Sequence, residues 1–146
     1  MSAANLCTET ARRSSSFPGI DLPALQGSVL VVEDESFVRE VTAEILRAAG
    51  YEVLKAQNAA EAITIFRQNH DHIALLVLDV VLPGRNGRDL ARDLTRDQPE
   101  LRTIFISGYP ENAITRDAAI RGKAFYLPKP FSVDSLMRKV REAFVD

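Results

Sequence analysis

The fold is decided by the stretch VLVVEDE at residues 29–35, in which four apolar residues run directly into three acidic ones. A continuous apolar run of this kind is typical of a strand in a parallel sheet, because such a strand is buried on both faces. Apolar residues then recur at the spacing of an α-helix, at Val38, Val41, Ile45 and Ala48. Gly50 follows and is suited to the left-handed conformation that ends many helices. The stretch therefore predicts a buried strand followed by an amphipathic helix.

The same alternation continues along the rest of the chain. Further strands are expected at residues 51–56, 74–78, 103–106 and 124–127. Helices are expected from a capping pair at Asn58 and Glu61, around Leu90 and Leu94, over residues 113–120, and from Ser132 with Val133, Leu136, Val140 and Phe144 inward. Five strands that alternate with five helices predict an α/β fold with a doubly wound, five-stranded parallel sheet. We expect the strand order 2-1-3-4-5, because right-handed crossovers leave few arrangements.

Composition narrows the class of protein further. The net charge of −2 argues against direct nucleic-acid binding, which normally needs clustered Lys and Arg. The single cysteine, Cys7, has no internal partner for a disulfide, which indicates a reducing compartment. Because no apolar run approaches the ~20 residues of a membrane span, a cytoplasmic protein without a membrane contact is expected. Residues 1–27 are expected to form a flexible arm with a short helical turn near residues 22–25, ahead of one domain at 28–146.

Polar residues follow four of the expected strands at their carboxyl ends. Glu33 and Asp34 follow the first strand, Asp79 the third and Ser107 the fourth, and Lys129 comes shortly after the fifth. In the expected strand order these ends are neighbours, where ligands bind to such sheets. Carboxylates held together repel one another unless a cation relieves them, and Mg²⁺ prefers oxygen ligands. A carboxylate nucleophile beside a metal, an ammonium and a hydroxyl predicts in-line phosphoryl transfer.

These motifs, in this order, resemble the receiver domain of response regulators in two-component signalling. The resemblance is carried by VLVVEDE at 29–35, LDVVLPG at 78–84 with Gly87, ISG at 106–108 and KPF at 129–131. The run SGYPENA at 107–113 is most similar to receivers attached to, or working beside, hybrid histidine kinases. The resemblance covers about residues 28–146 and implies the flavodoxin-like receiver fold.

The resemblance also implies a phosphoacceptor and a metal site. Asp79 would take a phosphoryl group from a histidine kinase or a histidine phosphotransfer protein. Asp34, Asp79 and the backbone carbonyl of Val81 would ligate Mg²⁺, and Glu33 would act directly or through a water molecule. The chain would then be a phosphoprotein of a phosphorelay, with catalytic character toward its own phosphorylation but no metabolic activity.

A switch and an output surface complete the implied mechanism. Lys129 would pair with the phosphoryl oxygens and precede a cis bond to Pro130, while Ser107 and Tyr126 would move toward the site as the switch. The output surface would be formed by the expected helix at 113–120, the strand at 124–127 and the helix from Ser132. It would bind a downstream protein or a second copy of the chain.

The sequence departs from the usual receiver pattern at four positions. Glu33 stands where Asp is common, which lengthens one arm of the metal site but keeps its charge. Gly108 replaces a frequent Ala and should loosen the loop after the fourth strand. Val81 and Tyr109 occupy positions that govern the access of water in the family, and an apolar residue and a large aromatic there suggest a slow loss of phosphate.

Three alternatives remain open at this point. A phosphatase of the haloacid dehalogenase type also uses a strand-end Asp, but it needs a second Asp two residues later, where Val81 stands. A pseudo-receiver would act only as a binding module, and the presence of Asp34, Asp79, Ser107 and Lys129 argues against it. A phosphate sink would drain a kinase and would need no output surface. Since no effector segment follows Phe144, we expect a stand-alone receiver, or one excised from a longer protein, that signals through protein contact.

Overall fold

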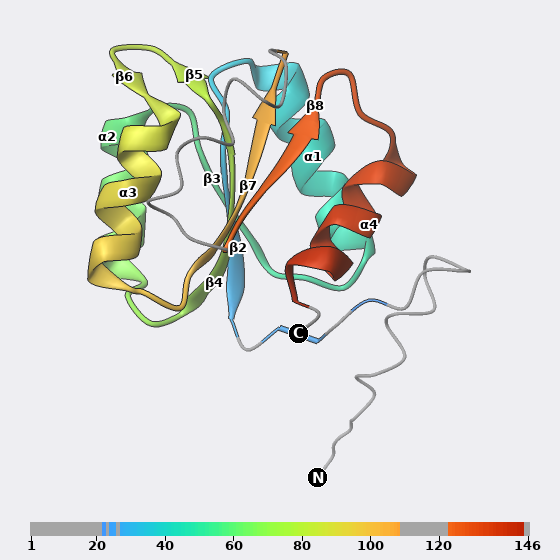
Figure 1. Ribbon diagram of the computed structural model, residues 1–146, viewed down its shortest axis with the longest axis horizontal. Coiled ribbons are helices and arrows are strands. Elements are labelled where there is room, and N and C mark those ends of the chain that lie inside the picture. The colour runs from blue at the N-terminus through green and yellow to red at the C-terminus, as the bar shows by residue number, and fades with distance from the viewer. Residues whose placement is uncertain (1–21, 23, 26, 109–122, 145–146) are drawn as a thin grey trace, which may run out of the picture.

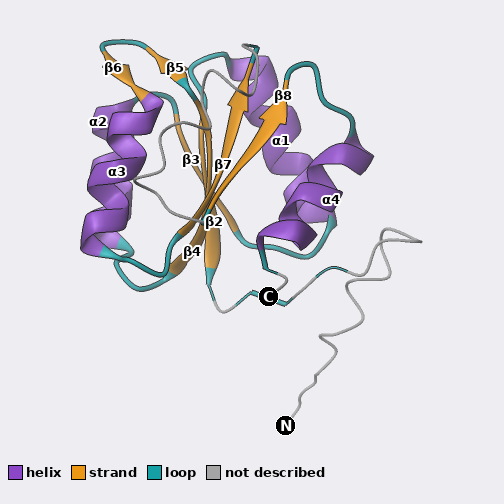
Figure 2. Cartoon of the chain, viewed as in Figure 1, coloured by secondary structure: helices purple, strands orange, loops and turns teal. Residues whose placement is uncertain are grey.

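The computed structural model describes residues 22, 24–25, 27–108 and 123–144, and these form a parallel sheet between two layers of helices (Figures 1 and 2). The strands of the sheet are β2 (Ser28–Val32), β3 (Val53–Ala56), β4 (Ile73–Asp79), β7 (Arg102–Ser107) and β8 (Ala124–Pro128). Their spatial order is β3-β2-β4-β7-β8, with every neighbouring pair parallel. Counted along the chain, this is the predicted order 2-1-3-4-5, so the predicted fold class is confirmed.

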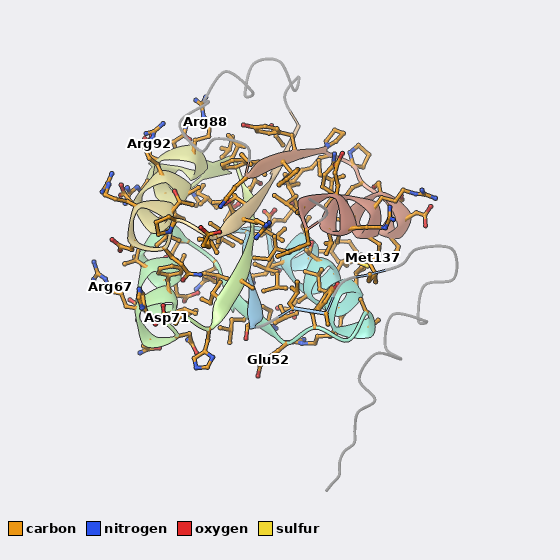
Figure 3. The ribbon with its side chains drawn as sticks, turned by 60° about the horizontal axis from the view of Figure 1, so that its bottom comes forward. Glu52, Arg67, Asp71, Arg88, Arg92 and Met137 are labelled. Atoms are coloured by element: carbon orange, nitrogen blue, oxygen red, sulfur yellow. The ribbon has the colours of Figure 1, made fainter. Side chains whose placement is uncertain are left out.

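Four described helices and one small hairpin surround the sheet. The helices are α1 (Ser36–Ala48), α2 (Ala59–Gln68), α3 (Gly87–Asp97) and α4 (Val133–Ala143), and the hairpin is β5 (Val81–Leu82) with β6 (Arg85–Asn86). Helices α2 and α3 cover one face of the sheet, and α1 and α4 cover the other (Figure 1). Charged side chains such as Arg67, Arg88 and Arg92 extend outward from α2 and α3, away from the sheet (Figure 3). No described helix is long and apolar enough to cross a membrane.

The central strand β4 explains why the sheet has helices on both sides. Successive side chains of a strand point to opposite faces. Leu76 and Leu78 accordingly pack in the core under α2 and α3, whereas Leu75 and Val77 pack in the core under α1 and α4. All four are buried. A strand that is apolar on both faces has to be covered on both, which requires crossover helices on each side.

Local capping signals place the helices where the sequence predicts them. The Asn58 side chain accepts a hydrogen bond of 2.8 Å from the backbone N–H of Glu61, and Glu61 Oε1 accepts one of 2.8 Å from the backbone N–H of Gln57. Ser132 and Ser135 form a reciprocal capping box at the start of α4. Gly50 has a φ of 98°, which confirms the left-handed residue expected after α1.

The predicted buried face of α1 is wrong by part of a turn. Val41 is 37% exposed and Ala48 is exposed, whereas Thr42, Ala43 and Leu46 are buried. Thr42 tolerates burial because its hydroxyl donates a hydrogen bond of 2.7 Å to a backbone carbonyl one turn earlier. In α4 the prediction holds for Leu136 and Val140 but fails for Val133, which is 45% exposed, and it omits the buried Met137.

The segment before β2 also differs from the expectation. The helical turn predicted near residues 22–25 is absent from the described residues there. Leu22 is instead buried in the core shared with α1 and α4, and the half-buried Leu25 packs against it. Two hydrogen bonds from Ser28 then fix the entry into β2, one from its N–H to the carbonyl of His72 (2.6 Å) and one from its hydroxyl to Glu52 (2.7 Å). The helix expected at 113–120, as well as Cys7 and Tyr109, lies outside the described residues.

Candidate functional site

The site lies where the carboxyl ends of four parallel strands meet. Glu33 directly follows β2, Asp79 ends β4, Ser107 ends β7, and Lys129 directly follows β8. The register pairs Val32 with Leu78, Asp79 with Ile106, and Ser107 with Pro128, so the ends lie level with one another. The strand-end residues predicted from the sequence are therefore brought to one edge of the sheet.

Three carboxylates gather at this edge. Ligand oxygens of Glu33, Asp34 and Asp79 all lie within 4.8 Å of one another. Glu33 and Asp79 are buried, and Asp34 is exposed. Within the described ranges, no other group of His, Cys, Asp and Glu side chains is arranged to hold a metal ion. His70 and His72 are exposed and are not part of this group.

Lys129 and a backbone N–H hold the Asp79 carboxylate in place. Lys129 Nζ lies 2.7 Å from Asp79 Oδ2 and 3.3 Å from Glu33 Oε1. The backbone N–H of Val81 donates a hydrogen bond of 2.9 Å to Asp79 Oδ1. The backbone N–H of Lys129 bonds to the carbonyl of Ser107 at 2.8 Å, and the bond from Lys129 to Pro130 is cis, as expected. Both carboxylate oxygens of Asp79 are thus oriented by donors on different elements.

The electrostatics of the site centre on Glu33. Burial, followed by the nearby charge of Asp79, raises the pKa of Glu33 to about 7, although a hydrogen bond from the backbone N–H of Glu35 and the charge of Lys129 act to lower it. The pKa of Lys129 is raised: burial acts to lower it, but its contacts with Asp79 and Glu33 outweigh burial. Glu33 Oε1 is buried and accepts no hydrogen bond of acceptable geometry, although Lys129 is near.

This set of donors fits a hard divalent cation. A buried carboxylate oxygen without a hydrogen bond, beside two further carboxylates, is a local excess of negative charge that one lysine does not neutralise. Oxygen ligands of this type, with one member of the group exposed to solvent, match a cation that keeps several waters.

The hairpin β5–β6 shapes the backbone next to Asp79. Pro83 and Gly84 form the turn between the two strands of the hairpin, and Gly84 has a φ of 74°. Val81, whose carbonyl is a predicted metal ligand, begins the hairpin with its side chain 54% exposed. At the other end the backbone N–H of Gly87 bonds to the carbonyl of Val80 at 2.7 Å. Only two apolar residues precede the turn, and a run of two residues is too short to be recognised as a strand from the sequence.

A Gly87→Ala variant is expected to lower the free energy of unfolding by about 1–3 kcal/mol, because overpacking in a well-packed site costs that much. A Cβ at Gly87 would lie 2.3 Å from the carbonyl oxygen of Asp79 and 3.0 Å from backbone atoms of Val80. Urea unfolding measures the change. Gly108→Ala is the matched control: a Cβ there meets nothing within 4 Å, so its stability should be unchanged or slightly higher. Equal effects of the two substitutions would contradict the steric account.

The predicted switch residues lie on the strands β7 and β8. Ser107 is buried at the end of β7 and Tyr126 is half-buried in β8. The Tyr126 ring stacks on Phe105 of β7, with centroids 5.4 Å apart and an interplanar angle of 17°. Phe105 is fully buried, and its sequence position predicts no role beyond its strand. An apolar residue in a strand does not by itself indicate which ring it stacks on, so the contact between Phe105 and Tyr126 could not be predicted from the sequence.

The residue two places after Asp79 argues against one of the alternatives. The phosphatase alternative requires an acid two residues after the nucleophile, and that position holds the apolar, half-exposed side chain of Val81. The side chain of Val81 has no proton that it could donate to a leaving group.

Comparison with known proteins agrees with this geometry. The chain is 39% identical over 120 residues to the sensor kinase CckA of Brucella abortus, covering 81% of this chain but only 13% of the kinase. It is 31% identical to the response regulator receiver protein CpdR of the same organism, covering 80% of this chain and 96% of CpdR. A solved structure of the response regulator TrrA from Thermotoga maritima, in complex with Mg²⁺ and BeF, is 29% identical. It superposes with a TM-score of 0.70 over 81% of this chain and 99% of TrrA.

Residues 29–141 match the family of the response regulator receiver domain, and this range contains the whole site. The match includes all the carboxylates, Ser107, Tyr126 and Lys129. The chain therefore belongs to the response regulator receiver domain family.

Proposed function

We propose that this receiver domain accepts its phosphoryl group on Asp79, from a histidine kinase or a histidine phosphotransfer protein. The observation that carries the proposal is the environment of Asp79 at the end of β4. Its two oxygens are held by Lys129 and by the Val81 N–H, beside two further carboxylates. Glu33 is also buried near Lys129, but Asp79 is the last residue of its strand and makes the shorter contact with Lys129 Nζ, at 2.7 Å against 3.3 Å.

The reaction would form one bond and break one. An oxygen of Asp79 attacks the phosphorus of the donor, the phosphorus–nitrogen bond of the phosphohistidine breaks, and the imidazole nitrogen leaves with the electron pair. Lys129 is placed to pair with the phosphoryl oxygens, since it already lies 2.7 Å from Asp79 Oδ2. The buried hydroxyl residue Ser107 at the neighbouring strand end is proposed to bind the same phosphoryl group.

Asp34, Asp79 and the carbonyl of Val81, with Glu33 directly or through water, would hold Mg²⁺. The ion would neutralise charge on the transferring phosphoryl group. The support for Mg²⁺ is the oxygen-only donor set and the related structure of TrrA, which was obtained with Mg²⁺ and BeF.

The test of the proposal is phosphorylation by a small phosphodonor with and without Mg²⁺. We expect one phosphoryl group per chain, removed by chelation of the metal. In an Asp34→Ala variant the affinity for Mg²⁺ should fall by at least ~10-fold, because even an outer partner of a metal site is worth that much. Asp97, an exposed residue of α3, supplies the control Asp97→Ala, which should match the unsubstituted chain. Unchanged Mg²⁺ affinity in Asp34→Ala would place the metal elsewhere.

The output of the domain is proposed to pass through β8 and α4 to a protein partner or a second copy of the chain. Phosphorylation at Asp79 would shift Ser107 and Tyr126, which lie on the strands next to α4. Arg138 is exposed on α4 and pairs only loosely with Asp134, at 3.3 Å. Arg138→Glu should therefore weaken phosphorylation-dependent association while leaving phosphorylation itself unchanged. A phosphate sink, by contrast, would keep its biological effect in this variant.

A further inference from the structure

Arg39 of α1 contacts the backbone that carries two of the three carboxylates. Its Nη1 donates a hydrogen bond of 2.9 Å to the carbonyl of Glu33 and approaches the carbonyl of Asp34 at 3.4 Å. The side chain is only 16% exposed, which is low for an arginine on the outer end of a helix. Arg39 therefore folds back over the connection between β2 and α1 instead of extending into water.

The guanidinium of Arg39 contacts backbone carbonyl oxygens and not the nearby carboxylates of the cluster. Three carboxylates lie at the adjacent strand ends, yet its closest contacts are two carbonyl oxygens, and its Nε lies 3.8 Å from the exposed carboxylate of Glu40. The cation that does contact the cluster is Lys129. Arg39 thus contacts the two peptide groups on either side of the Asp34 Cα and leaves the carboxylates available.

Two more hydrogen bonds close the same loop. The backbone N–H of Glu35 donates to Glu33 Oε2 at 3.1 Å, and the backbone N–H of Arg39 donates to the carbonyl of Glu35 at 2.9 Å. The backbone of residues 33–35 is therefore tied to the first turn of α1 at three points. Glu35, which precedes α1, provides no side-chain cap, and Arg39 does not replace one, because a guanidinium only donates hydrogen bonds whereas the first N–H groups of a helix need acceptors.

We propose that Arg39 is a positioning residue for the metal site, holding the Glu33–Asp34 backbone so that both carboxylates face Asp79. The inference rests on the proposed function, because it concerns the cation that phosphorylation requires. Groups that orient metal ligands from behind typically contribute 10–100-fold to metal affinity. If the backbone of Glu33 and Asp34 were mobile, binding of the metal would have to order it at a cost in conformational entropy. The hydrogen bonds from Arg39 order this backbone before the metal binds, so that cost is smaller.

The sign of the effect separates positioning from electrostatics. A positive charge near a cation site repels the cation, so removal of the charge alone would strengthen Mg²⁺ binding. Loss of the hydrogen bonds to the two carbonyls would weaken binding. A neutral substitution that weakens binding therefore reports the hydrogen bonds.

The experiment is calorimetric titration of Mg²⁺ into the full chain carrying Arg39→Gln. We expect affinity 10–100-fold below that of the unsubstituted chain, with displaced amide resonances for residues 33–35 before any metal is added. Arg47→Gln is the matched control: Arg47 lies on the same helix, pairs with exposed Glu44 at 3.1 Å, and its loss should leave the affinity unchanged. Arg39→Lys keeps the charge but not the planar fork, so it should also bind Mg²⁺ more weakly.

Equal or tighter binding by Arg39→Gln overturns the inference; if that variant does not fold, unchanged affinity in Arg39→Lys overturns it instead. Failure of the proposed function has a different signature. In that case the unsubstituted chain itself would bind no Mg²⁺ or would take up no phosphoryl group from a small phosphodonor.

Discussion

An Asp79→Asn variant is expected to take up no phosphoryl group under conditions in which the unsubstituted chain takes up one. The amide retains a carbonyl oxygen that can accept the hydrogen bond from the Val81 N–H, now 2.9 Å from Asp79 Oδ1. It lacks the anionic oxygen needed to attack phosphorus, and it removes the partner that lies 2.7 Å from Lys129 Nζ. The loss should therefore be complete without unfolding the chain. Intact-mass spectrometry after incubation with a phosphodonor and Mg²⁺ measures it.

Asp71→Asn is the matched control for this substitution. Asp71 is exposed and has a φ of 74°, a conformation that Asn tolerates well, so the same chemical change should leave phosphorylation intact. Thermal unfolding of both variants verifies that each is folded. Labelling of Asp79→Asn at the level of the control would mean that another side chain is the acceptor.

A Glu33→Gln variant is expected to be more stable than the unsubstituted chain above about pH 7 when Mg²⁺ is absent. Glu33 is buried beside Asp79 and its pKa is raised from 4.5 to about 7 in the folded protein. Folding therefore opposes its ionisation, and the amide removes that cost. One pKa unit corresponds to about 1.4 kcal/mol, so the gain in free energy of unfolding should be on the order of 1–3 kcal/mol.

The pH dependence of this gain has a definite sign. Below pH 4.5 Glu33 is protonated in the folded and unfolded chains, so its ionisation contributes nothing to the difference between the two proteins. As the pH rises to about 7 the unfolded chain ionises first, and the unsubstituted protein loses stability relative to the variant. Above about pH 7 the difference is constant. The other charged side chains at the site are Asp34, Asp79 and Lys129, and both proteins contain all three.

Urea unfolding over this pH range, in a chelating buffer, measures the difference. Glu44→Gln serves as the control, because Glu44 is exposed and its substitution should change stability by less than ~0.5 kcal/mol. Saturating Mg²⁺ should reduce or reverse the gain, since the cation favours the ionised carboxylate. If the difference in free energy of unfolding between the two proteins did not change from pH 4 to pH 8, the pKa of Glu33 would not be raised in the folded protein, which would contradict the prediction.

The sheet could be predicted from the sequence because its strands are continuous apolar runs. Every residue of β2 is buried, and apolar runs of this kind leave few other structures open. The site followed from the sheet, since Asp79, Ser107 and Lys129 needed only the strand order to be placed together. Periodicity also located the four described helices, and the capping pair of Asn58 and Glu61 fixed the start of α2 to the residue.

Features that depend on tertiary contact were not predictable. The buried face of α1 was misplaced because Thr42 satisfies its hydroxyl within the helix, which makes a polar residue acceptable in the core. Leu22 lies in a segment whose composition suggests no packing, yet it occupies the core. Arg39 carries no distinguishing spacing; only the direction of its side chain, toward two carbonyls at the strand end, gives it a role.

The measurement that tests the account most directly locates the phosphoryl group on the chain. The full chain is phosphorylated with a small phosphodonor and Mg²⁺, the acyl phosphate is reduced with borohydride, and the peptides are sequenced by mass spectrometry. The account predicts a single reduced residue, at Asp79, the carboxylate held by Lys129 and the Val81 N–H. Reduction at Glu33 or Asp34 instead, or no reduced residue in a chain that binds Mg²⁺, would contradict it.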